Sequence, residues 1–192
     1  MKKGLVVIAV IVGLLVLVAM WFMGTYNSLV SMDVKVDEGW SQVEVQYQRR
    51  FDLIPNLVET VKGVANFEKS TYTAVTEARS AWAQSMQNGT RAEQITATNN
   101  VESALARLLV TVENYPQLKA NENFSTLQAQ IEGTENRVSV ARQDYNQVVT
   151  PYNTKIRTFP ASFVATLFGF TTKDFFGSDD TAANGPAVNF GN

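Results

Sequence analysis

The chain opens with a long, uniformly apolar stretch. Residues 5–23 read LVVIAVIVGLLVLVAMWFM and contain no charged side chain. As an α-helix, these 19 residues would extend roughly 28 Å at about 1.5 Å per residue, close to the hydrocarbon thickness of a bilayer. The pattern therefore predicts a transmembrane helix.

A cleaved secretory signal is the alternative interpretation of this stretch. Signals usually have an apolar region of about 7 to 15 residues that ends in small residues. The best cleavage candidate, residues 17–19, is poor, and Trp21 and Phe22 follow it closely. Aromatic residues of this kind suit the membrane interface, so a retained anchor at residues 1–24 is favoured.

The charges that flank the stretch predict its orientation. Lys2 and Lys3 precede it, and Lys35 alone follows shortly after it. By the positive-inside rule, two charges against one favour a cytoplasmic N-terminus and a body on the extracytoplasmic, periplasmic side.

Beyond the anchor, apolar side chains recur every three or four residues, which is the period of an amphipathic helix. Four such stripes predict four long helices at residues 29–54, 58–86, 98–115 and 124–156. Pro55, an Asn-Gly pair at 88–89 and Pro116 separate them, and all three favour breaks or turns. No stretch alternates polar and apolar residues as a strand would.

Short connections between amphipathic helices favour antiparallel neighbours. We therefore predict an all-α fold, with an N-terminal transmembrane helix followed by an antiparallel up-down four-helix bundle of long helices. A rival arrangement joins the first two stripes into one helix bent at Pro55. Thr90 and Glu93 are spaced as a capping box, and Ser125 offers a start signal for the last helix. Gly24 leaves open whether the first helix continues the anchor.

The pattern divides the chain into four regions. Residues 1–24 are the anchor, residues 25–159 the helical bundle, residues 160–176 a Phe-rich apolar segment near the membrane, and residues 177–192 a tail. The tail is rich in Gly, Asn, Asp and Pro without apolar periodicity, which predicts disorder.

The Phe-rich segment is too short to span a membrane. It can cover the end of the bundle, lie in the headgroup layer, or pack against a neighbouring copy. Coverage of the bundle is favoured, because large apolar patches seldom stay exposed. Candidate residues for membrane contact or self-association are Phe163, Leu167, Phe168, Phe170, Phe175 and Phe176.

Composition argues against most catalytic chemistry. The 192 residues include no histidine and no cysteine, and the net charge is −2. Triads with histidine, thiol nucleophiles and Cys- or His-based metal sites are therefore excluded, and no basic patch favours nucleic acid. Scattered carboxylates at helical spacing are usually solvated or paired. We predict no enzymatic activity, no cofactor and no metal.

Several longer motifs carry a family resemblance. They are RRFDLIPNLVETVKG at 49–63, YNSLV at 26–30, ENYPQLKA at 113–120 and ARQDYN at 141–146. With these motifs, the chain resembles the LemA family from the anchor to about Phe170. The resemblance implies a bacterial inner-membrane protein with an N-terminal anchor and an all-helical body. Some members look like magnetosome-associated proteins, others occur beside membrane proteases, and some descriptions place the N-terminus outside.

In an up-down bundle the motifs around Pro55 and Pro116 share the membrane-distal end. In a structural interpretation, the prolines break helices, Asp52 and Asn56 cap helix ends, and Arg49 or Arg50 pairs with Glu113. In a functional interpretation, this tip binds a partner. The candidate tip residues are Arg49, Arg50, Asp52, Pro55, Asn56, Glu113, Tyr115 and Pro116.

These features predict a non-enzymatic, single-pass membrane protein that self-assembles into a homo-oligomer or organises and scaffolds other components at the bacterial membrane. The alternative is an adaptor or regulator whose distal tip docks on another membrane protein, for example a membrane protease.

Overall fold

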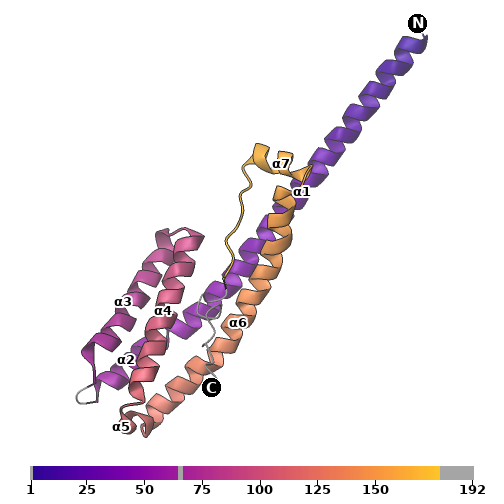
Figure 1. Ribbon diagram of the computed structural model, residues 1–192. Coiled ribbons are helices and arrows are strands. Elements are labelled where there is room, and N and C mark those ends of the chain that lie inside the picture. The colour runs from indigo at the N-terminus through magenta and orange to yellow at the C-terminus, as the bar shows by residue number, and fades with distance from the viewer. Residues whose placement is uncertain (1, 65–66, 178–192) are drawn as a thin grey trace, which may run out of the picture. The chain divides into compact units, whose positions relative to one another are not determined.

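The computed structural model describes residues 2–64 and 67–177 (Figure 1). These residues form helices, and no strand occurs among them, so the predicted all-α fold class is confirmed. The chain divides into two compact units. Unit 1 comprises Met1–Val43 and Gln143–Lys173, and unit 2 comprises Glu44–Arg142 and Asp174–Asn192. Apart from Gly177, the predicted disordered tail lies outside the described residues.

Helix α1 spans Lys2–Phe51 without a break. The question that Gly24 left open is therefore answered, because the apolar stretch and the first amphipathic stripe belong to one continuous helix. The amphipathic stripe is buried as predicted, at Leu29, Val36, Trp40, Val43, Tyr47 and Phe51.

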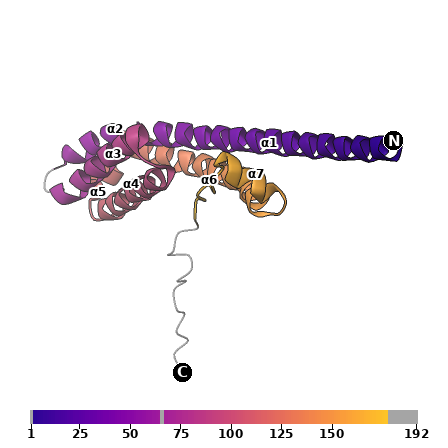
Figure 2. The ribbon, with the colours of Figure 1, turned by 90° about the horizontal axis from the view of Figure 1, so that it is seen from above.

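In unit 1, the C-terminal part of α6 (Glu122–Arg157) lies beside α1, as Figure 1 and Figure 2 both show. Gly39 permits the close approach, because a Cβ there would lie only 3.1 Å from Cγ2 of Val148 and 3.5 Å from the Cα of Tyr145. The neighbouring Trp40 ring meets Tyr145 edge-on at a centroid distance of 5.4 Å. Helix α6 continues through Pro151, and Val149, Tyr152 and Ile156 are buried in its last turns.

Helix α7 (Ala161–Phe168) completes unit 1. Gly169 ends the helix with φ at 74°, in the left-handed region where glycine has no steric penalty. The described chain then continues without regular structure to Gly177.

Unit 2 contains the remaining helices: α2 (Ile54–Lys62), α3 (Lys69–Asn88), α4 (Arg91–Val112) and α5 (Pro116–Lys119). The single helix predicted at 58–86 is therefore two helices, and α2 packs against α3. The chain reverses after α2 and not at Pro55, where Leu57 N still donates to Leu53 O at 3.1 Å. Proline fits this first helical turn because it needs no amide hydrogen there.

The predicted capping box at α4 is confirmed. Glu93 N donates to the Thr90 hydroxyl at 3.3 Å, and Thr90 N donates to the Glu93 carboxylate at 2.7 Å. The Thr90 amide and the Thr90 hydroxyl, which both donate to the Glu93 carboxylate, lower the pKa of Glu93 because they stabilise its charged form. The start signal for α6 is Asn121 and not Ser125, since the side-chain oxygen Oδ1 of Asn121 accepts from the amides of Asn123 and Phe124.

Replacement of Gly39 by leucine should force α1 and α6 apart and lower the free energy of unfolding by about 1 to 3 kcal/mol. The matched control variant is Gly133→Leu on α6, where an added Cβ meets nothing within 4 Å. That change should be neutral or stabilising, because glycine is a poor helix former. Thermal unfolding by circular dichroism in detergent measures both, and equal effects would contradict the close approach.

Candidate functional site

The apolar part of α1 is largely uncovered within the described chain. Its most apolar window is entirely unburied, and α1 is the one helix among the described residues that is long and apolar enough to cross a membrane. Its exposed large apolar side chains range from 72% exposed at Leu5 to 43% at Trp21. Such a surface is stable only when something apolar surrounds it.

Helix α7 packs beside the end of this apolar stretch. The Phe168 ring lies 5.8 Å from Phe22 and 4.6 Å from Tyr26, and Phe170 lies 6.0 Å from Tyr26. Val164 and Ala165 of α7 are buried in the same unit. Part of the Phe-rich segment therefore covers unit 1.

The other face of α7 is exposed. Phe163 is 65% exposed and Leu167 is 61% exposed. The two residues are four positions apart and share one helix face. Phe159, just before the helix, is 83% exposed. These three large apolar side chains thus remain largely uncovered by the described chain, and Phe168 is itself 49% exposed.

The segment after α7 is fastened to unit 1 by polar contacts. The Asn153 side chain donates to Lys173 O at 2.8 Å and accepts from Lys173 N at 2.9 Å. The Lys173 ammonium pairs with Asp33 of α1 at 2.7 Å. The Tyr152 hydroxyl donates to Thr171 O at 3.0 Å. We call Asp33, Tyr152, Asn153 and Lys173 the clip.

Burial and the nearby Asp33 charge raise the pKa of Tyr152 to about 12. Both effects disfavour the phenolate, which would have to lose its solvation beside a carboxylate. The hydroxyl consequently stays protonated, and able to donate to Thr171, well above neutral pH.

An open groove of about 790 Å³ follows α6 in unit 1. Met32 of α1 lines one side, and Pro151 and Thr154 of α6 line another. Phe159 and Ala161 close the end near α7. No part of this lining carries a carboxylate. We call it the Met32–Phe159 groove.

Unit 2 encloses a cluster of charged side chains. Glu102 of α4 accepts from Arg142 at 2.7 Å and from the Tyr47 hydroxyl at 3.2 Å. Arg50, only 8% exposed, lies 3.8 Å from Glu102 and also donates to Glu135. Burial and the Glu102 charge raise the pKa of Tyr47.

Arg142 also ties the C-terminal segment into unit 2. Its guanidinium lies 5.1 Å from the Phe176 ring and 5.3 Å from the Tyr47 ring. Phe176 is 6% exposed, so this predicted surface residue lies inside the unit. Phe175 next to it is 46% exposed.

The proposed pairing of Arg50 with Glu113 is wrong. Arg50 belongs to the buried cluster, whereas Glu113 pairs with Lys119 at the surface. Asp52 does not cap α2 either. It accepts from Gln48 at 2.6 Å and lies 3.7 Å from Arg79, which also donates to Phe51 O.

The remaining tip residues lie in unit 2. Tyr115 is half-buried, with its ring 4.8 Å from Phe67. The exposed ones are Arg49, Pro55, Asn56 and Pro116. The sequence interpretation missed Glu102, which directly follows the buried stripe residue Val101, and it quoted Arg142 within a motif without assigning it a role.

Across residues 2–64 and 67–177, no group of three or more acidic side chains is placed to hold a metal ion. The carboxylates of Glu102 and Glu135 are joined through Arg50. Pairing of this kind compensates the buried charge of Arg50.

Comparison with known proteins points to one family. The model of the LemA family matches residues 39–190. Similar curated proteins include magnetosome protein MamQ 1 of Paramagnetospirillum magneticum and magnetosome protein MamQ of Magnetospirillum gryphiswaldense, each 25% identical over 174 residues. Protein LemA of Metamycoplasma hominis is 24% identical over 144 residues.

The matches cover most of this chain but less of the relatives. They span 79% of this chain and 64% of each MamQ protein, and 75% of this chain and 65% of protein LemA. The chain therefore covers just under two thirds of the length of these curated relatives.

The charged cluster predicts a large effect of one uncharged substitution. Glu102→Gln should lower the free energy of unfolding by about 2 to 3 kcal/mol, because it leaves the largely buried Arg142 without its carboxylate. The control Glu113→Gln removes an exposed ion pair and should cost under about 1 kcal/mol. Thermal unfolding by circular dichroism compares them, and a Glu102→Gln protein as stable as the control would refute the cluster's role.

The raised pKa of Tyr152 makes the free energy of unfolding depend on pH in the alkaline range. The folded-state pKa lies above the ordinary value, so its contribution is complete below about pH 10 and is lost as pH rises toward 12. Tyr152→Phe should be less stable than the native chain at pH 8, since it lacks the bond to Thr171, and the gap should narrow between pH 10 and 12. Chemical unfolding across this pH range measures the gap, and a constant gap would contradict the assignment.

Proposed function

Because the chain belongs to the LemA family, we propose that it is a non-enzymatic, single-pass protein of the bacterial inner membrane that assembles with copies of itself and organises components there. The observation that carries this proposal is the continuity of α1. One helix runs from the exposed apolar stretch into the packed core of unit 1. A helix of this kind supports a rigid connection between membrane and body.

Three further observations support the absence of catalysis. The chain has neither histidine nor cysteine, the described residues hold no metal-binding group, and their buried charges are paired. Two of the relatives are named as magnetosome proteins, which favours a part in building a cellular structure.

Self-association is supported by the Met32–Phe159 groove. Its open lining includes Lys155 and three threonines but exposes mainly apolar atoms, and exposed apolar surfaces usually mark interaction sites. A second copy presents the same α1 and α6 faces, so a symmetric pair could cover both grooves at once. We place the body on the extracytoplasmic side, on the basis of Lys2 and Lys3 before the apolar stretch.

The mass of the full-length chain in mild detergent tests the proposal. We expect a discrete oligomer that Thr154→Arg reduces to smaller species, because the new charge enters the groove. Thr96→Arg on α4 is the matched control, since both threonines are exposed and donate to a carbonyl four residues earlier at 2.8 and 2.9 Å. A monomeric native chain would reject self-assembly.

In that event the adaptor function becomes the candidate, favoured by the exposed Arg49, Pro55 and Asn56 on unit 2. Arg49→Ala with Asn56→Ala should then remove a co-purifying membrane protein while leaving thermal unfolding unchanged, because neither side chain is buried.

A further inference from the structure

We infer that the exposed face of α7, formed by Phe163 and Leu167, inserts into the headgroup layer of the membrane as a second, interfacial contact beside the anchor. The inference rests on the anchoring part of the proposed function and not on self-association. Its partner is a lipid surface.

Position supplies the first argument. The apolar stretch ends at Met23, and Phe168 contacts Phe22 and Tyr26 on either side of that end. If residues 5–23 fill the hydrocarbon core, the boundary between acyl chains and headgroups lies at the height of these contacts. Helix α7 is therefore held at this boundary by its own packing.

Chemistry supplies the second argument. Helix α7 reads ASFVATLF and contains no charged residue. One side is buried through Val164 and Ala165, while Phe163 and Leu167 project from the other. Interfacial helices bury such a face about 5 to 10 Å into the boundary between headgroups and acyl chains. In water, the same side chains would remain uncovered.

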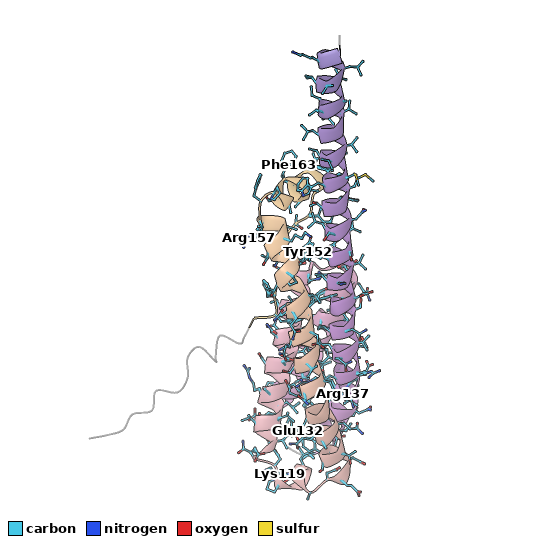
Figure 3. All side chains as sticks on the ribbon, turned by 90° about the vertical axis from the view of Figure 1, so that its right-hand side faces the viewer. Lys119, Glu132, Arg137, Tyr152, Arg157 and Phe163 are labelled. Atoms are coloured by element: carbon cyan, nitrogen blue, oxygen red, sulfur yellow. The ribbon has the colours of Figure 1, made fainter. Side chains whose placement is uncertain are left out.

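Charge supplies the third argument, and the sequence alone did not reveal it. The Phe-rich segment has few basic residues of its own, but α6 ends directly before it with Lys155 and Arg157. Figure 3 shows Arg157 near this end of α6 and Phe163 on the adjoining α7. Arg157 is exposed, and Lys155 donates to Ser28 of α1 at 2.6 Å. Cations beside an apolar face favour anionic headgroups.

The clip keeps α7 in place. Lys173 is held by Asp33 and Asn153, so the chain after α7 is joined to α1 and α6. An eight-residue helix would be marginal alone. Here its orientation is set before it meets lipid, which lowers the entropic cost of insertion.

Spin labels on single introduced cysteines can test the inference, because the native chain has no cysteine. The full chain is reconstituted into vesicles of phosphatidylethanolamine and phosphatidylglycerol, with Phe163→Cys or Leu167→Cys labelled. The ratio of collisions with oxygen to collisions with a water-soluble nickel chelate reports lipid exposure. We expect this ratio at both sites to be several-fold higher than at an aqueous reference.

Val34→Cys provides that reference. Val34 is 51% exposed on α1 of the same unit, and it lies 11 residues beyond Met23, which is roughly 16 Å along the helix. Leu14→Cys in the apolar stretch provides the lipid reference. An aqueous ratio at 163 and 167 with a lipid ratio at 14 would overturn the inference alone, whereas aqueous ratios at all sites would overturn the anchor itself.

A second copy on the α7 face would leave a different signature. Labels at 163 would then show spin–spin broadening that disappears when labelled protein is diluted with unlabelled protein, together with a low oxygen ratio. That result would also overturn the inference. Self-association would still be tested separately, by the mass of the native chain in detergent.

Discussion

The rest of unit 1 depends on one constraint, which is that the apolar surface of residues 5–23 must be kept out of water. The most apolar window of this stretch is entirely unburied within the described chain, so its stability requires a surrounding that replaces water. A lipid bilayer provides this and also demands that every backbone hydrogen bond be made within the segment. An unbroken α-helix meets that demand. Because α1 continues as the same helix beyond Met23, residues that pack on its next turns acquire a defined height relative to the apolar stretch.

Helix α7 shows how this constraint spreads to segments distant in sequence. The Phe168 ring contacts α1 near residues 22 and 26, and the clip joins residues 171 and 173 to α6 and α1. Hydrogen bonds of this kind individually contribute about 0.5 to 1.5 kcal/mol, too little to hold a mobile segment alone. Their combination with ring packing fixes the C-terminal end of α7. Phe163 and Leu167 are exposed because the opposite face of α7, with Val164 and Ala165, is the one held against the rest of unit 1.

Periodicity predicted the buried stripes well, because burial on a helix follows its repeat. It failed where a residue is compatible with more than one local structure or partner. Pro55 stops an incoming helix but equally starts a new one, so it marked the end of α1 and not the reversal of the chain after α2. The partners of Arg50 could not be predicted, since Glu102, Glu113 and Glu135 are equally suitable by charge. Only the packing of α4 and α6 in unit 2 selects Glu102 and Glu135.

In the Phe-rich segment, residue type alone likewise does not predict which side chains are buried. Phe163 and Phe176 look alike in sequence, yet Phe163 is 65% exposed and Phe176 is 6% exposed. Phe176 is covered because Arg142, already neutralised by Glu102, offers its guanidinium face to the ring. A paired guanidinium is less costly to bury and still attracts an aromatic face. One charged cluster therefore stabilises unit 2 and removes Phe176 from the surface, and the apolar surface of the segment is concentrated at α7.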